Sequence, residues 1–257
     1  MIDLACERTT GGQNKILRYL NIMIHIVTYA THEQGKLRGL VNNRFGVDVT
    51  VLGWGQKWNG FTDKYKGVQK FLETVDDNDI VVFLDGFDTV IEKDPKDLEQ
   101  LFESKNCDIL FSKDHTGEFF KSIFGTCKDG VTANTGMYMG RVKALKPLMK
   151  DCLTIRCGDD QVNLNGLCMK YDNLKINMEE DIFYNGDDGD AIFTQTFMVT
   201  RERSTRLLKD MTQFYIGDIV TGLLLIAALF PLIRLYVLAL LVVVIVFFLR
   251  KCDRSCT

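Results

Sequence analysis

The sequence lacks the cysteine and histidine patterns that build zinc sites. It has eight cysteines but no Cys-x-x-Cys pair, and it has only three histidines. Cys152, Cys157 and Cys168 lie near one another in the sequence, but no histidine stands at a ligand spacing beside them. Structural zinc sites need such spacings, so we expect none here. We predict that the cysteines are reduced thiols rather than disulfides.

The chain also lacks any block of basic residues. Its net charge is -3 at pH 7, so we predict no nucleic acid or other polyanionic partner. The first 20 residues contain no long apolar stretch, because charged side chains such as Glu7, Arg8 and Lys15 interrupt them. We therefore expect no signal peptide, and we treat residues 1–21 as an N-terminal extension.

Charge is almost absent from one long segment near the C-terminus. Between residues 219 and 249 the only charged residue is Arg234, which together with Pro231 divides the segment into two apolar arms. A straight helix needs about 20 residues to span a bilayer, and each arm is shorter than that. One interpretation is a single span over about 229–249, with Arg234 reaching toward an interface. The other is a short transmembrane hairpin bent at 231–234.

The flanks of this segment and the length of its arms favour different topologies. Basic residues such as Arg206 precede it and others such as Arg250 follow it, which favours a hairpin with both ends in the cytosol. The arm length favours the single span, which we prefer. In either case the lipid bilayer is a predicted partner, and the anchor is the last element made. We therefore predict a cytosolic N-terminal domain, and a lumenal orientation stays open.

The segment between these ends has the alternating pattern of an α/β domain. Apolar runs predict strands at 22–29, 47–52, 81–85 and 108–112, and helical spacing predicts helices near 36–45, from residue 65 onward and near 96–104. Such alternation is typical of a mostly parallel sheet with flanking helices, whose ligands lie beyond the carboxyl ends of the strands. The chain therefore divides into an extension at 1–21, a domain at 22–212, a membrane segment at 217–250 and a tail at 251–257.

The strand at 81–85 ends in two aspartates that are three residues apart. Asp85 and Asp88 are too costly to bury without a partner, so we expect them at the mouth of the sheet, where they could hold a divalent cation near a phosphate. The simpler alternative is a strand followed by an Asp-Gly turn. A phosphatase of the haloacid dehalogenase type is disfavoured, because its two aspartates stand two residues apart.

A second acidic pair, Asp159 and Asp160, opens a predicted helix. Acidic residues at this position cap the helix and pair with its dipole, and from the local sequence alone we favour that interpretation. Closer to the N-terminus, the segment Asn134-Thr135-Gly136 is predicted to be a turn that leads into an apolar strand.

Taken together and in order, these elements resemble the glycosyltransferase domain of the procollagen lysyl hydroxylases and the related collagen galactosyltransferase-like proteins. The resemblance covers about residues 22–208. No single motif is specific, but six in the same order are. The matching segments are Val27-Thr28-Tyr29-Ala30-Thr31, Val51-Leu52-Gly53-Trp54-Gly55-Gln56-Lys57-Trp58, 81–88, Asn134-Thr135-Gly136 with Gly140, Asp159-Asp160-Gln161 and Asp181-Ile182-Phe183.

The resemblance implies a GT-A fold, a UDP-sugar donor and Mn²⁺ or Mg²⁺. It assigns the metal to Asp85 and Asp88, and it places Asn134, Asp159 and Asp160 on the side of the sugar and the acceptor. The residues it places around the nucleotide are Thr28, Trp58, Gly86, Phe87 and Lys64, with Lys66 as an alternative to Lys64. The implied acceptor is a protein or glycan, with hydroxylysine or galactosyl-hydroxylysine of collagen-like chains as the family's example.

One motif of the family is missing. Its members carry a metal-binding histidine in a late His-x-Asn-Gly segment, and here Thr200 is the residue we align with that histidine. Arg201 or Arg203 could instead neutralise the diphosphate of the donor. The alternative function is a catalytically degenerate GT-A fold that serves as a membrane-tethered binding module.

Overall fold

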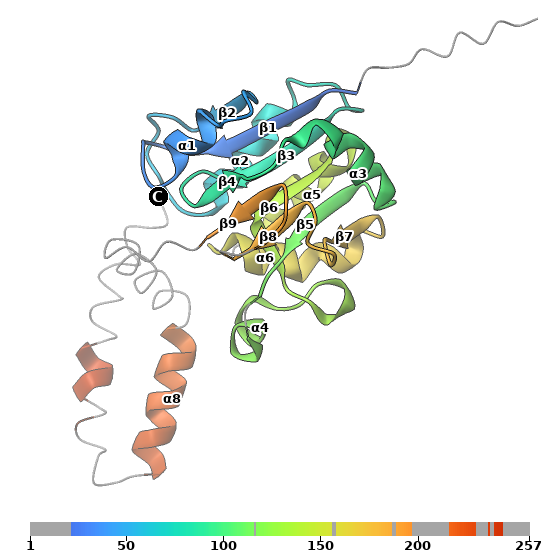
Figure 1. Cartoon of the computed structure of the whole chain (residues 1–257). Helices are drawn as coiled ribbons and strands as arrows, with labels where there is room; N and C mark the ends of the chain where they lie inside the picture. Colours follow the sequence, from blue (N-terminus) through green and yellow to red (C-terminus); the bar gives the residue numbers. More distant parts are fainter. Residues whose placement is uncertain are drawn as a thin grey trace, which may run out of the picture.

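The structure is a computed structural model that describes residues 22–115, 117–155, 158–186, 189–196, 216–229, 236 and 239–243. Its main part is a layered α/β domain, and Figure 1 draws a helix from the C-terminal region below this domain and apart from it. Thr200, Arg201 and Arg203 fall outside the described residues.

The central sheet has six strands in the order β2-β1-β3-β6-β5-β7. Five of them run in the same direction, and β6 alone is antiparallel to its neighbours β3 and β5. The mostly parallel sheet predicted from the sequence is therefore confirmed. The strands are β1 (Ile24–Tyr29), β2 (Val49–Leu52), β3 (Ile80–Asp85), β5 (Ile109–Lys113), β6 (Ala133–Arg141) and β7 (Leu174–Ile176).

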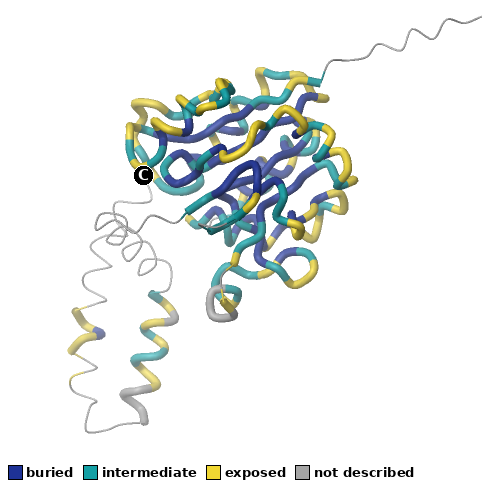
Figure 2. The backbone as a smooth tube through the Cα atoms, viewed as in Figure 1, coloured by how far each residue is buried: buried dark blue, intermediate teal, exposed yellow. Residues whose placement is uncertain are grey.

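Helices cover both faces of this sheet because successive side chains of a strand point to opposite faces. On β3, Val81 and Phe83 belong to one apolar core with α2 (Thr62–Leu72), α5 (Val142–Thr154) and α6 (Asp160–Leu167). Val82 and Leu84 belong to the other core with α1 (Leu37–Val41) and α3 (Leu98–Ser104). Figure 2 shows the strands as the buried centre between these two layers.

A smaller sheet lies next to the carboxyl end of β3. It has three strands in the order β4-β9-β8, namely β4 (Thr89–Ile91), β9 (Phe193–Gln195) and β8 (Phe183–Asn185). Because β4 follows the turn after β3, this sheet joins the late part of the chain to the aspartates. The remaining elements are η1 (Pro95–Asp97), α4 (Glu118–Phe124), η2 (Lys128–Gly130) and η3 (Cys168–Lys170).

Two local predictions differ from the structure. The first helix is shorter than the predicted 36–45, because the Asn43 amide donates to the carbonyls of Leu40 and Val47 and forms a turn after α1. The segment Asn134–Gly136 lies inside β6 instead of forming a turn. Its pairing with β5 shifts register between Phe111 and Ser112, so an irregular strand carries the turn-like sequence.

The prediction of reduced cysteines is wrong for one pair. Cys127 and Cys168 form a disulfide that joins residues 41 apart, and both are buried beneath α6 and its neighbours. Cys107 and Cys152 are free thiols. The sequence could not reveal this pairing, because the two cysteines come together only when the chain folds over the sheet.

The C-terminal region contains the helix α8 (Ile216–Leu229) and a second helical segment at 239–243. Leu241 is buried against Val220 and Leu223 of α8, so the segment 239–243 lies beside α8 (Figure 1). The contact joins a described part of each predicted arm. Within the described part of the chain, no helix combines the length and apolar composition needed to cross a bilayer.

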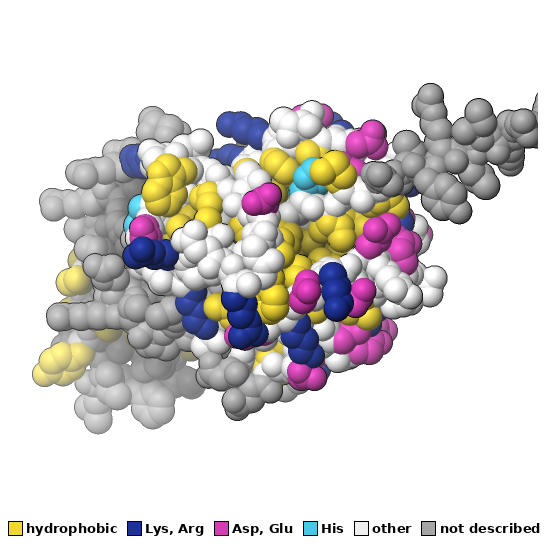
Figure 3. Space-filling model, turned by 45° about the horizontal axis from the view of Figure 1, so that its top comes forward, with side chains coloured by type: hydrophobic (Ala, Val, Ile, Leu, Met, Phe, Trp, Pro, Cys, Tyr) yellow, Lys and Arg dark blue, Asp and Glu magenta, His cyan; other side chains and the backbone are white. Residues whose placement is uncertain are grey.

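The surface of the α/β domain mixes charge of both signs with apolar side chains. On the face drawn in Figure 3, apolar side chains lie between groups of basic and acidic residues. One hollow, of about 430 Å³, lies between the end of β2 and α2, where Tyr29, Asn59, Lys66 and Lys70 are among its lining residues. It contains neither aspartate pair, so the site below is built from side-chain geometry.

Candidate active site

The first part of the site is the turn that joins β3 to β4. Asp85 is the last residue of β3, and Asp88 directly precedes β4. Asp88 is 1% exposed, whereas the Asp85 side chain is 23% exposed. The Asp88 carbonyl accepts a hydrogen bond from the backbone N–H of Thr196, which follows β9. The turn is therefore held between two sheets, as expected for a rigid binding loop.

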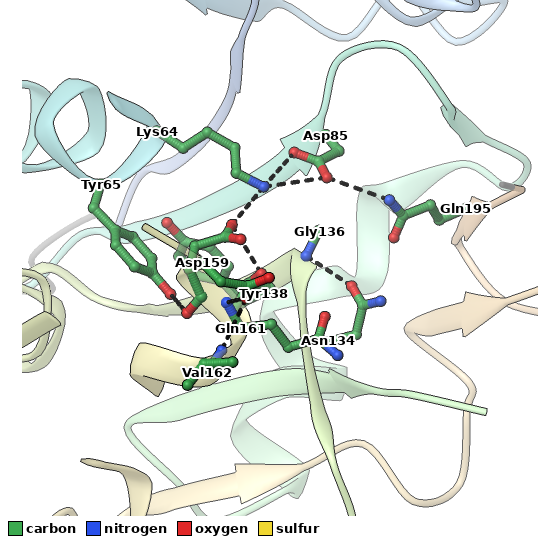
Figure 4. Close-up of polar contacts among 12 residues, drawn as sticks. Lys64, Tyr65, Asp85, Asn134, Gly136, Tyr138, Asp159, Gln161, Val162 and Gln195 are labelled. Carbon is green, nitrogen blue, oxygen red and sulfur yellow. Dashed lines mark hydrogen bonds and ion pairs between the residues drawn. The ribbon is translucent and has the colours of Figure 1, made fainter. Parts of the chain in front are cut away.

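Lys64, on α2, connects this turn to the second acidic pair (Figure 4). Its Nζ lies 3.1 Å from Asp85 Oδ1 and 2.6 Å from Asp160 Oδ2, and its side chain is only 9% exposed. Burial alone lowers the pKa of an amine, but the neighbouring charges of Asp160 and Asp85 outweigh it and raise the Lys64 pKa. Lys64 is therefore a permanent buried cation between two carboxylates.

Asp85 retains its proton more strongly than a free aspartate. Burial raises its pKa to about 6, and the charges of Asp88 and Asp160 act in the same direction, although Lys64 opposes them. Three carboxylates and one ammonium group therefore share a small volume. The repulsion among these carboxylates, which contributes to the raised Asp85 pKa, is a physical reason for this cluster to take up a cation.

The second acidic pair stands at the start of α6. Asp159 is the N-cap residue, and its Oδ1 accepts from the backbone N–H groups of Gln161 and Val162, as the capping interpretation predicts. Asp160 turns inward, where Thr135 donates a hydrogen bond to its Oδ2 over 2.9 Å. Burial and the charge of Asp160 raise the Asp159 pKa to about 6.

Asn134 lies one residue before Thr135 on β6. Its side-chain oxygen accepts from the backbone N–H of Gly136 at 2.7 Å, which holds the side chain close to its own strand. Figure 4 shows Asn134 on the same side of the site as the acidic residues, with its dashed contact going to Gly136 of its own strand.

The residues predicted around the nucleotide cluster near the carboxyl end of β1. Thr28 is fully buried, its hydroxyl has no hydrogen-bond partner, and a Cβ added to Gly86 would lie only 2.8 Å from that hydroxyl. Gly86 is thus needed for close contact between the β3 turn and β1. The Trp58 ring lies 5.9 Å from Tyr29, at the end of β1.

Phe87 lies on the other side of this segment. Its ring is 5.4 Å from that of His32, and its carbonyl accepts from the backbone N–H of Lys36. Lys66, the alternative to Lys64, points to the surface instead and pairs with Asp63. The structure therefore brings Lys64 to the aspartates and leaves Lys66 away from them.

Gln195 is a site residue that the sequence did not reveal. It is the last residue of β9, and its Nε2 lies 3.4 Å from Asp85 Oδ2 and 3.2 Å from Asp88 Oδ1. The only sequence signal is a three-residue strand that ends in a polar residue. The sequence predicts the late metal-site residue at Thr200, which lies outside the described residues; within them, Gln195 lies at this turn.

These residues fit a divalent cation of the Mn²⁺ or Mg²⁺ type. One oxygen of Asp85 and one of Asp88 approach the same nitrogen of Gln195, so the two carboxylates face a common point. Carboxylate and amide oxygens are the ligands that such hard cations prefer. Among the described residues, no group of three or more His, Cys, Asp or Glu side chains has the geometry of a metal site.

The comparison with protein families decides the class of the protein. A model described as the PLOD GT domain matches residues 21–210. The chain belongs to this family. It is therefore a glycosyltransferase, and the resemblance seen in the sequence is confirmed. No curated protein matches the sequence.

Comparison with solved structures gives matches of low sequence identity. The bifunctional glycosyltransferase WbbM is 13% identical, with a TM-score of 0.46. The match covers 71% of this chain and 47% of WbbM, so this chain spans about half the length of WbbM. The galactosyltransferase LgtC, in complex with donor and acceptor sugar analogs, is 15% identical, with a TM-score of 0.44. The match covers 72% of this chain and 95% of LgtC. A197 from STIV is 18% identical; the match covers 49% of this chain and 68% of that chain, with a TM-score of 0.35.

Proposed function

We propose that this PLOD GT domain transfers a hexose from a UDP-sugar in a reaction that needs Mn²⁺ or Mg²⁺. The observation that carries the proposal is the convergence of Asp85 and Asp88 on one point, beside a buried lysine. When bound there, a divalent cation would neutralise the negative charge that develops on the diphosphate as it leaves.

The chain's own residues divide the remaining work between the two ends of the donor. Thr28, Trp58 and Phe87 surround the end of β1 and orient the nucleotide. Asp159 and Asp160 lie across Lys64 from the metal-binding turn, where a carboxylate stabilises the positive charge of an oxocarbenium-like sugar. Lys64 keeps Asp85 and Asp160 in fixed positions, because it binds both of them.

The acceptor that we propose is a hydroxyl group on a protein or glycan. Kinship with the collagen-modifying family supports hydroxylysine or galactosyl-hydroxylysine of a collagen-like chain. Peptides that carry either group, tested as acceptors with labelled UDP-sugars, address this directly. Transfer to neither peptide, with donor turnover intact, would exclude both acceptors.

Hydrolysis of UDP-glucose and UDP-galactose in the presence of Mn²⁺ tests the function. We expect UDP release by the full chain and background release by Asp85→Ala and Asp88→Ala, because each lacks one metal-binding carboxylate. Asp48→Ala is the matched control, since Asp48 is exposed and far along the chain from the turn. Background release by the parent chain would leave only the membrane-tethered binding module.

For the C-terminal region we propose a hairpin anchor that inserts into lipid. Support comes from the apolar length of residues 219–249 and from the contact of Leu241 with α8. Leu224 and Leu225 are more than half exposed on α8, as expected for side chains that meet lipid. Co-flotation of the full chain with phosphatidylcholine vesicles tests this, and unchanged flotation of a Leu224→Asp, Leu225→Asp variant would contradict it.

The compartment of the catalytic domain is a separate proposal. Our cytosolic prediction relied on the late position of the anchor, whereas the Cys127–Cys168 disulfide supports an oxidising compartment such as the secretory lumen. We therefore propose a lumenal catalytic domain. Protease protection in sealed microsomes would support it, and cleavage of the domain without detergent would contradict it.

A further inference from the structure

Gln195 is held rigidly beside the metal-binding turn by its own backbone. It pairs with Thr89 of β4 on one side and with Asn185 of β8 on the other. The next residue, Thr196, donates its backbone N–H to the carbonyl of Asp88 at 3.0 Å. The side chain therefore starts from a position fixed relative to the aspartates, which is the condition for a preorganised ligand.

The end of the Gln195 side chain lies directly against both carboxylates. Its Nε2 is within 3.4 Å of Asp85 Oδ2 and Asp88 Oδ1, while its Oε1 is buried and has no hydrogen-bond partner (Figure 4). Leaving a buried amide oxygen unpartnered costs free energy. This oxygen is therefore available to a ligand that the protein binds.

Gly136 on β6 forms the floor beneath this amide. A Cβ at position 136 would lie 2.4 Å from Gln195 Oε1 and 2.5 Å from Nε2, so the amide fills the space that the glycine leaves open. The two ends of an amide are nearly the same size. A half-turn about the last side-chain bond exchanges them in this space and turns Oε1 toward the two carboxylates.

We propose that Gln195 is the third protein ligand of the cation held by Asp85 and Asp88, through its side-chain oxygen Oε1. The inference rests on the proposed function, because it needs a metal at the turn. An amide oxygen is a suitable ligand for Mn²⁺ or Mg²⁺, whereas an N–H group cannot bind a cation. In this arrangement the turn and β9 supply three oxygen ligands and leave positions open for phosphate.

The competing explanation is that Gln195 is a spacer whose N–H groups reduce repulsion between the aspartates. The two roles predict different metal affinities. A ligand contributes directly to metal binding, so its removal lowers the affinity for the metal. Removal of a spacer that donates to the same carboxylates frees them, and metal binding is unchanged or tighter.

Mn²⁺ binding to the full chain in the presence of UDP, followed by the electron paramagnetic resonance signal of free Mn²⁺, separates these roles. We expect Gln195→Ala to bind Mn²⁺ about tenfold more weakly or worse. Gln195→Glu, which keeps an oxygen at the same place, should bind at least as tightly as the parent. The matched control is Asn185→Ala, because Asn185 pairs with Gln195 but its amide donates to Ser112 and Lys113 instead.

A second measurement avoids reliance on loss of binding. In Gln195→His the imidazole nitrogen would become a ligand, so pulsed spectra of the bound Mn²⁺ should show coupling to ¹⁴N that the parent lacks. Parent-like affinity in Gln195→Ala, or no nitrogen coupling in Gln195→His, would overturn the inference while the metal site stands. Absence of Mn²⁺ binding in the parent would overturn it together with the metal dependence proposed above.

Discussion

The two aspartate pairs of the site, one at the β3 turn and one at the start of α6, are held in opposite ways. In the first pair the buried member, Asp88, contacts an amide, and Asp85 faces the partly open side. In the second pair the buried member, Asp160, contacts a cation and a hydroxyl, and Asp159 caps the helix. The first pair is therefore positioned by a turn between two sheets, while the second is positioned by the start of a helix.

This difference indicates what each pair can do. The carboxylates of the first pair approach the same amide nitrogen, which is the arrangement expected of two ligands of one cation. The second pair is held by Lys64, Thr135 and backbone N–H groups, so its carboxylates keep their position while a sugar is bound beside them. Lys64 contacts one member of each pair, so it links the two halves of the site.

The largest expected effect comes from neutralising one member of each pair. Asp88→Asn should lower kcat/KM for UDP-sugar hydrolysis by about 1000-fold, because the metal and the donor are both lost. Asp160→Asn should lower kcat by about 100-fold with little change in KM, because the donor still binds. Steady-state kinetics with Mn²⁺ measures both. Equal changes in KM for the two variants would contradict the different roles assigned to the two aspartate pairs.

A smaller effect is expected from replacing Lys64, which contacts one aspartate of each pair. Lys64→Met leaves Asp85 and Asp160 without their cation, which should lower the free energy of unfolding by about 3 kcal/mol. Lys66→Met is the control on the same helix, where an exposed pair with Asp63 should contribute less than about 1 kcal/mol. Urea unfolding measures both variants. Equal losses would show that Lys64 does not compensate buried charge.

The smallest effect concerns the helix cap and its dependence on pH. The folded-state pKa of Asp159, about 6, lies above its ordinary value of 3.8, so protonation favours the folded protein. That stability is fully present below the ordinary pKa and is lost as the pH rises through about 6. Asp159→Asn keeps the cap and does not titrate, so it should remove this loss.

The measurement is urea unfolding of the parent and Asp159→Asn at about pH 3.5 and about pH 7, on the two sides of that window. We expect the variant to gain stability relative to the parent at the higher pH. Asp48→Asn, an exposed site, supplies the reference profile. Parallel profiles for all three proteins would mean that the cap carboxylate titrates normally.

Local patterns in the sequence were enough to predict the frame of the site. The run ending at Asp85 is apolar and β-branched, and it forms the central strand β3 with both faces buried. Asp159 follows the capping rule. Both features depend on neighbours in the sequence, whereas Lys64 was chosen from the family resemblance, with Lys66 as the alternative.

The missed features all depend on contacts between distant residues. Gln195 meets Asp85 across 110 positions, through a three-residue strand too short to show periodicity. The Cys127–Cys168 disulfide and the contact of Leu241 with α8 also join separate segments. The sequence could not identify these contacts, because it contains several polar, cysteine or apolar residues that could have formed each of them.

The central claim is that the β3 turn is a metal-dependent nucleotide site, and calorimetric titration of UDP tests it most directly. The full chain should bind UDP with Mn²⁺ present and lose that binding when EDTA removes the metal. Asp88→Asn should show no binding in either condition, while Asp160→Asn should bind UDP like the parent. UDP binding of equal strength in EDTA, or retained in Asp88→Asn, would contradict the account.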